Sequence, residues 1–217
     1  MCAKKVRRHV SSPIDSNEIC FMNYLAHLVI GGPDPDLMVG NFMGDSIKGS
    51  AHSMLPKAVA AGVLLHRWID SEADAHPLSQ ASRADLRPIL GRMSGVGLDL
   101  LHDYFLARNF NQILPQWQLE AFVDHVESIL AQRKNEMPDR SQRFFTAMSE
   151  HRWLKEYGNR SKMLQVCRSM DARIAWDSNL NELFEAVDRV GEAALEARFL
   201  ELISDLMNRR SEKWPSW

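Results

Sequence analysis

The sequence has 217 residues, of which 45% are hydrophobic and 25% charged, and its formal net charge at pH 7 is −2. A soluble globular protein has this composition, and a chain of this length fits one domain or one domain with an appendage, with a sizeable core. The near-neutral charge disfavours a nucleic-acid-binding protein, which would carry a large excess of Lys and Arg.

The chain carries no recognisable membrane segment. No apolar run approaches the roughly 20 residues that a membrane helix needs, and the longest one, Ala58 to Leu65, is followed by His66 and Arg67. The three cysteines lie at no metal-ligand or disulfide spacing, which is typical of the reducing cytoplasm. We therefore expect a cytoplasmic protein without a membrane partner or a structural disulfide.

The first 21 residues differ from the rest. They contain four basic residues and several serines but no apolar stretch of the kind found in a secretory signal. Nothing in them offers a surface to pack. We expect residues 1–21 to form a disordered extension and residues 22–217 to form the folded domain.

From Met22 onward, apolar residues recur three and four positions apart, which predicts helices. In chain order the pattern runs through Leu25–Val29, Leu37–Ile47, Val59–Ile69, Leu98–Leu106, Phe122–Leu130, Leu164–Met170 and Leu183–Leu206. Glycines and prolines separate these stretches, and none alternates as a strand would. The sequence predicts an all-α, single-domain bundle of seven to nine helices, including a long helix from about Asn179 to Arg210.

Six acidic or imidazole side chains lie inside these apolar helical stretches. They are His27, Asp45, His66, Asp70, Asp99 and Asp103. A buried carboxylate or imidazole is costly unless it is paired or binds a metal. Several of them at helical spacing favour a polar centre inside the bundle, and a metal is the best explanation for it.

The segment from Leu64 to Pro77 holds the densest group. His66, Asp70 and Asp74 are four residues apart and so lie along one helix face, with Arg67 beside them. Imidazole and carboxylate bind divalent cations such as Mn²⁺, and a guanidinium can hold a phosphate. The alternative is that these are only helix-stabilising pairs worth roughly 0.2 to 0.5 kcal/mol each.

The other polar positions admit more than one interpretation. Asp99 follows Gly97 and could cap a helix or point inward with Asp103, which lies in the helix body. His27 alone is more often a hydrogen-bonded core histidine, and Asp45 could begin a helix. Their occurrence on four successive helical segments favours one shared site. No serine-hydrolase, P-loop, zincin or zinc-finger motif is present.

Four motifs together resemble one known family. They are MNYLAHL at 22–28, GNFMGD at 40–45, GVLLHRWID at 62–70 and LDLLHDYFLAR at 98–108. In this order and spacing they are similar to the acyl-carrier-protein phosphodiesterases of Gram-negative bacteria, and the similarity runs from Met22 to near the C-terminus. The family's stretch often has a histidine where this chain has Tyr104.

The resemblance implies an HD-domain-like helical fold and a metal-dependent phosphodiesterase that releases 4′-phosphopantetheine from the serine of holo acyl carrier protein. It implies Mn²⁺, or Mg²⁺ or another divalent cation, as cofactor. Carried over by motif, the metal ligands are His27, Asp45, His66 and Asp103. Asp70 would join them or orient the attacking water, and Arg67 would hold the phosphate. A divalent cation neutralises phosphate charge and activates water, which makes this set chemically coherent.

The sequence leaves open where the carrier protein binds, and it allows two other functions. Carrier proteins are acidic, so a negatively charged enzyme must gather basic residues locally, and the middle of the chain offers pairs such as Arg133 with Lys134 and Arg160 with Lys162. A nucleotide phosphohydrolase of the HD type would use much the same metal residues. A non-enzymatic helical interaction protein would instead keep the polar clusters as buried networks.

Overall fold

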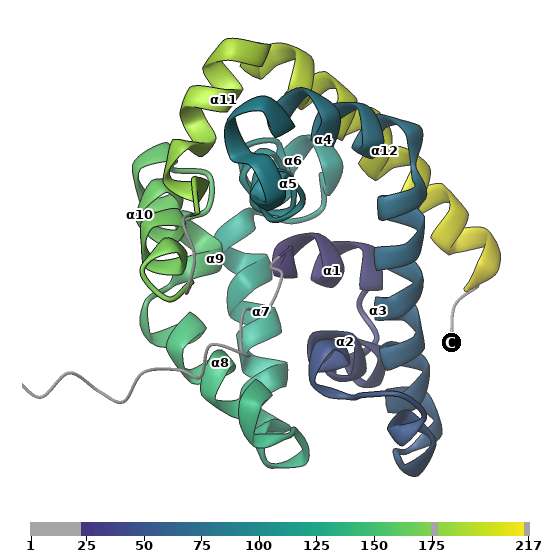
Figure 1. Cartoon of the computed structure of the whole chain (residues 1–217). Helices are drawn as coiled ribbons and strands as arrows, with labels where there is room; N and C mark the ends of the chain where they lie inside the picture. Colours follow the sequence, from purple (N-terminus) through teal and green to yellow (C-terminus); the bar gives the residue numbers. More distant parts are fainter. Residues whose placement is uncertain (1–22, 175–177, 215–217) are drawn as a thin grey trace, which may run out of the picture.

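The computed structural model describes residues 23–174 and 178–214, and these fold into an assembly of helices (Figure 1). The expected all-α class is confirmed, since the described residues contain α- and 3₁₀-helices and no strand. The expected extension at residues 1–21 lies outside the described residues. No helix in the described part of the chain has the length and apolar character needed to cross a bilayer.

The described helices outnumber the seven to nine expected, because several are short. The α-helices are α1 (Tyr24–Gly31), α2 (Pro35–Phe42), α3 (Lys57–Ala75), α4 (Pro77–Leu90), α5 (Ser94–Arg108), α6 (Phe110–Ile113), α7 (Leu119–Gln132), α8 (Asp139–Glu150), α9 (Trp153–Glu156), α10 (Arg160–Asp171), α11 (Leu183–Val190) and α12 (Glu192–Lys213). The 3₁₀ turns are η1 (Gly44–Ser46), η2 (Ala51–Met54), η3 (Gly91–Met93), η4 (Lys134–Glu136) and η5 (Leu180–Glu182).

Local sequence explains several helix ends. The side chain of Asp34 accepts hydrogen bonds from two amides of the first turn of α2, and Pro35 occupies the first helical position. α3 ends before Pro77, and Nδ1 of His76 accepts a hydrogen bond from the amide of Leu78 at the start of α4. The predicted long helix from Asn179 to Arg210 is divided, because Gly191 adopts a φ of 104° between α11 and α12.

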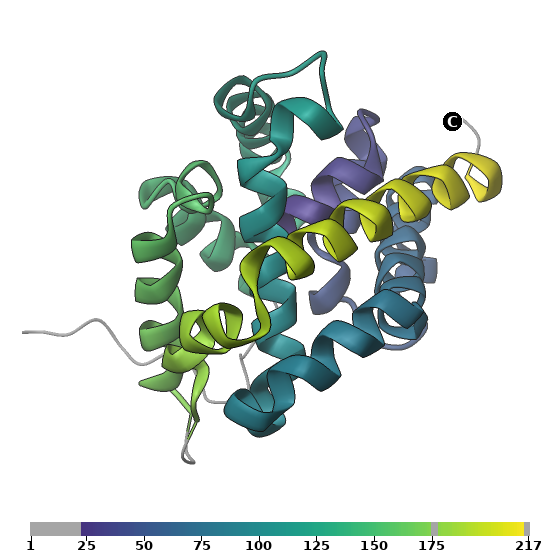
Figure 2. The same ribbon diagram turned by 90° about the horizontal axis from the view of Figure 1, so that it is seen from above.

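Helix α1 lies inside the bundle, and every one of its residues is buried. It packs against α2, α3, α5 and α12. Figure 1 shows it near the centre, between the end-on α5 and the short α2, with α3 running along one side. Seen from above, α12 crosses over the layer that contains α1, α3 and α5 (Figure 2). A polar side chain on α1 is therefore desolvated wherever it points.

Helices α2 and α3 cross at two glycines. A Cβ atom on Gly62 would lie 2.3 Å from the carbonyl oxygen of Leu37 and 2.8 Å from Cα of Gly40, and one on Gly40 would lie 2.0 Å from the carbonyl oxygen of Val59. Only glycine allows backbones to approach this closely. The crossing brings the end of α2 against the turn of α3 that carries His66.

Candidate metal centre

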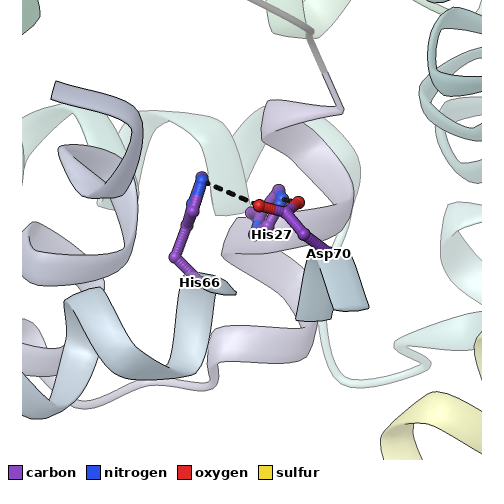
Figure 3. Close-up of side chains that lie close together, drawn as sticks. All are labelled: His27, His66 and Asp70. Atoms are coloured by element: carbon purple, nitrogen blue, oxygen red, sulfur yellow. Dashed lines mark hydrogen bonds and ion pairs between the residues drawn. The ribbon is translucent and has the colours of Figure 1, made fainter. Parts of the chain in front are cut away.

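Two histidines and one aspartate from different helices meet at the centre of the bundle (Figure 3). His27 comes from α1, and His66 and Asp70 come from successive turns of α3. Nε2 of His27 lies 3.0 Å from Oδ1 of Asp70, and Nε2 of His66 lies 3.3 Å from Oδ2 of the same carboxylate. One ligand atom from each of the three residues lies within 4.8 Å of the others. The sequence-based grouping of His27, His66 and Asp70 is thus reproduced in space.

Asp45 lies at the edge of this group. Its Oδ1 is 3.5 Å from Nε2 of His66, and its side chain is 30% exposed. Asp45 belongs to η1, directly after Gly44, where an added Cβ atom would lie 2.3 Å from the ring of His66. Gly44 therefore allows η1 to pass against the imidazole ring and places the Asp45 carboxylate beside it.

Asn41 orients His27, and the sequence analysis missed this residue. Its side chain is fully buried at the end of α2, where Nδ2 donates to the backbone carbonyl of His27 at 2.7 Å. Because a carbonyl only accepts, this contact fixes the amide so that Oδ1 faces Nδ1 of His27 at 3.1 Å. An amide inside a buried helix was the available signal, since Asn is a poor helix former that needs partners there.

The hydrogen bond to Asn41 determines which nitrogen of a neutral His27 carries the proton. Oδ1 of Asn41 is an acceptor, so Nδ1 of His27 must donate to it. Burial lowers the pKa of His27, and the neighbouring His66 lowers it further. A neutral His27 with its proton on Nδ1 turns the lone pair of Nε2 toward the Asp70 carboxylate, 3.0 Å away.

Nε2 of His27 and Nε2 of His66 both face the Asp70 carboxylate, so a cation could be held between these atoms. Burial alone would lower the pKa of His66, but Asp45 and Asp70 outweigh it and raise the pKa above the usual value. The two imidazole rings are stacked with centroids 4.1 Å apart, so two protonated rings would repel each other. Imidazole nitrogens and carboxylate oxygens are suitable ligands for a divalent cation, which satisfies all of these atoms at once.

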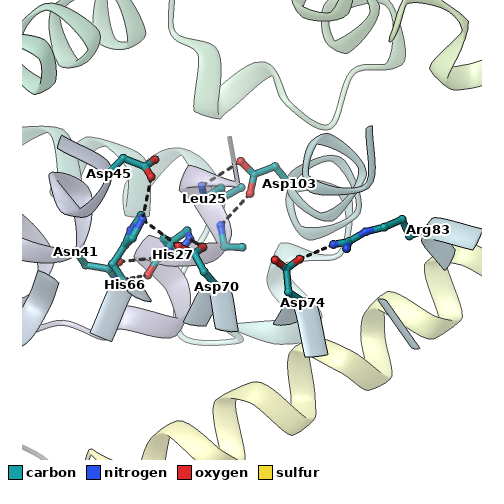
Figure 4. Close-up of polar contacts among 10 residues, drawn as sticks. Leu25, His27, Asn41, Asp45, His66, Asp70, Asp74, Arg83 and Asp103 are labelled. Carbon is teal, nitrogen blue, oxygen red and sulfur yellow. Dashed lines mark hydrogen bonds and ion pairs between the residues drawn. The ribbon is translucent and has the colours of Figure 1, made fainter. Parts of the chain in front are cut away.

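Asp103 lies apart from the group. It is completely buried on α5, and its two oxygens accept hydrogen bonds from the amides of Leu25, at 3.1 Å, and Ala26, at 2.9 Å (Figure 4). Burial raises the pKa of Asp103, and these two hydrogen bonds oppose the rise. The carboxylate thus satisfies free amides in the first turn of α1, just ahead of His27. The structure does not bring it together with the ligands with which it was grouped in sequence.

Arg67 faces the segment that joins α2 to α3. Its Nη2 donates to the carbonyl of Ile47 at 2.7 Å, and Nη1 lies 3.5 Å from Nδ1 of His52. These contacts use two of the five N–H donors of the guanidinium. Arg67 therefore anchors the segment that follows Asp45, and further donors remain for a phosphate.

Asp99 is in the body of α5, so it is not the helix cap that the sequence allowed. It is half-buried, and burial together with the nearby Asp74 and Asp70 raises its pKa to about 8, against the opposing effect of Arg83. Asp74 itself forms an ion pair with Arg83, one turn beyond the metal-ligand candidates (Figure 4). Carboxylates are consequently concentrated next to the candidate centre, which attracts cations.

Comparison with known proteins identifies the family of this chain. The family model described as acyl carrier protein phosphodiesterase matches residues 22–206. This chain belongs to the acyl carrier protein phosphodiesterase family. The match begins at Met22, as the sequence motifs predicted.

Curated members of the family are similar over nearly their whole length. The acyl carrier protein phosphodiesterase of Yersinia pestis is 29% identical over 192 residues, which cover 88% of this chain and 99% of the relative. The family member from Photorhabdus laumondii is 27% identical, and the match covers 96% of its length. The one from Serratia proteamaculans is 29% identical, and the match covers 99% of its length. No solved structure matches the chain, so the HD-like relation stays a prediction.

Proposed function

We propose that this member of the acyl carrier protein phosphodiesterase family hydrolyses the phosphodiester between 4′-phosphopantetheine and a serine of holo acyl carrier protein, using a divalent cation held by His27, His66 and Asp70, with Asp45 beside them. The observation that carries the metal assignment is the convergence of Nε2 of His27 and Nε2 of His66 on the Asp70 carboxylate, at 3.0 Å and 3.3 Å. Two imidazoles with carboxylates form a mixed nitrogen and oxygen site for a divalent cation, and Mn²⁺ is the ion that the family resemblance implies.

The chain's own residues have separable roles. Asn41 holds His27 in the tautomer that leaves Nε2 free, and Asp45 and Asp70 supply negative charge that attracts the cation. A bound divalent cation neutralises the phosphodiester and lowers the pKa of a water. Arg67 offers N–H donors to a phosphate oxygen, which reduces the repulsion that protects an anionic ester from attack.

We also propose that the centre is a divergent HD-like site. Helices α1 and α3 each supply a histidine to it, and carboxylates come from α3 and η1. Metal sites in helical bundles are built in this way from facing helices. On this proposal Asp103 holds α1 in place, while His27, His66 and Asp70 bind the cation and Asp45 lies beside them.

The direct test is mass spectrometry of holo acyl carrier protein after incubation with the enzyme and Mn²⁺. Loss of the phosphopantetheine mass, abolished by a chelator and restored by Mn²⁺, is the expected result. A nucleotide panel under the same conditions tests the rival phosphohydrolase activity. If the nucleotides lose phosphate while the carrier protein stays intact, the proposed substrate is wrong.

Matched variants test the residues. Asp70→Asn and Asp45→Ala should abolish turnover with helical content intact, because each removes a carboxylate from the centre. Asp74→Asn is the control, because Asp74 lies on the same face of α3 one turn away and pairs with Arg83 outside the group. Full activity of Asp70→Asn, or equal loss in all three variants, would argue against this ligand set.

A further inference from the structure

A stretch of sequence without acidic residues separates Asp45 from Asp70, the two carboxylates of the candidate centre. Between Ser46 and Ile69 the sequence contains Lys48, Lys57 and Arg67 but no Asp or Glu, although acidic residues outnumber basic ones in the whole chain, 28 to 26. The stretch follows Asp45 directly and ends just before Asp70. The chain between these two carboxylates therefore carries only basic charge.

The same stretch exposes apolar surface. Met54 is 87% exposed at the end of η2, and Leu64 is 41% exposed on α3; they are the exposed large hydrophobic side chains among the described residues. Lys48 and Lys57 are exposed as well. We call Lys48, Met54, Lys57 and Leu64 the docking patch.

The contacts of Arg67 connect the docking patch to the centre. Arg67 is three residues after Leu64, so both lie toward the same side of α3. Its guanidinium donates to the carbonyl of Ile47, two residues after Asp45, and it directly follows His66. The docking patch thus belongs to the first half of α3 and to the segment that joins α2 to α3, which Arg67 links to the residues that follow Asp45.

The basic residues in the middle of the chain are differently placed. Arg133 forms ion pairs with Asp36 and Glu136, Lys155 with Asp124, and Arg160 with Asp188. The charge of these three residues is balanced locally by the protein's own carboxylates.

We propose that the docking patch binds the protein part of the substrate, through an acidic face of the carrier protein on which carboxylates surround apolar side chains. This inference rests on the proposed function. Lysines on the docking patch attract the carboxylates and raise the association rate, and Met54 and Leu64 bury apolar area on contact. The contact brings the modified serine toward the centre to which Arg67 connects the docking patch.

Steady-state kinetics with holo acyl carrier protein test the proposal. Lys48→Glu and Met54→Asp should each raise KM by about fivefold or more while kcat changes by less than about twofold, because docking precedes the chemical step. The salt dependence of kcat/KM should weaken in Lys48→Glu, since one attractive charge has become repulsive. Both side chains are exposed, and an unchanged kcat shows that each variant has folded.

The matched control is Arg189→Glu, the same charge reversal on exposed α11 at the opposite end of the molecule (Figure 1). Its KM should equal that of the wild type. The docking proposal is overturned if Lys48→Glu has the KM of the wild type, or if Arg189→Glu raises KM equally. In either case, turnover by the wild-type enzyme would still support the proposed function. A wild-type enzyme that never converts holo to apo carrier protein overturns both.

Discussion

Asn41 offers the sharpest test of how the centre is held together. The side chain is fully buried and makes two hydrogen bonds to one residue, to Nδ1 of His27 at 3.1 Å and to its backbone carbonyl at 2.7 Å. Asn41→Ala leaves a buried N–H donor of His27 without a partner and removes one hydrogen bond from its carbonyl. It also removes the hydrogen-bond acceptor that faces Nδ1 of His27.

Two effects of Asn41→Ala follow, and they have different sizes. An unsatisfied buried polar group costs about 1 to 3 kcal/mol, so losing two hydrogen bonds should lower the free energy of unfolding by about 2 to 4 kcal/mol. Freed of its orienting partner, His27 should bind the cation more weakly, and loss of such outer partners typically reduces metal affinity by about 10- to 100-fold.

Urea unfolding in a chelating buffer measures the first effect of Asn41→Ala, and calorimetric titration of the folded protein with Mn²⁺ measures the second. Asn109→Ala is the matched control. The amide of Asn109 also makes two hydrogen bonds, to the carbonyl of Phe105 and to Glu196, at the far end of α5. The Asn109→Ala variant should be less stable than the wild type but should bind Mn²⁺ with the same affinity. The reasoning is refuted if Asn41→Ala binds Mn²⁺ as tightly as the wild type does.

Three further outcomes are expected. Burial lowers the pKa of His102 to about 4. As pH falls from 6.5 toward 4, this histidine is therefore protonated in the unfolded chain but still neutral in the folded protein. Wild-type metal-free protein should therefore lose about 2 kcal/mol more than His102→Gln between pH 7.5 and pH 5 in urea unfolding. Gly62→Ala should lower the melting temperature and the Mn²⁺ affinity, because its Cβ atom would lie 2.3 Å from the carbonyl of Leu37, whereas Gly95→Ala, whose nearest contact is 3.8 Å, should not. Asp103→Asn should lower the free energy of unfolding by about 1 to 3 kcal/mol and keep metal binding; a folded Asp103→Asn protein that binds no metal would instead support the ligand role expected from sequence.

The sequence was sufficient to predict the all-α class and the grouping of His27, His66 and Asp70. Apolar spacing of three and four predicted the all-α class, and Pro77 and the glycines after Ile30 marked helix ends that the structure confirms. The four-residue spacing placed His66 and Asp70 on one face, which is a local property of any helix. His27 was assigned to the same group from its burial cost and from family resemblance, and its contact with Asp70 confirms that grouping.

Only the tertiary structure showed what each remaining polar residue contacts. Asp103 looked like a ligand because its carboxylate is buried, but a burial cost can be satisfied by amides as well as by a metal, and spacing does not distinguish them. Asn41 was missed because its role depends on the crossing of α2 and α3 at Gly40 and Gly62, which no local pattern encodes. Helical periodicity fixes which residues share a face, because that geometry repeats every turn. Which faces meet depends on how closely separate backbones can approach, and in this protein the glycines at the crossing determine that distance.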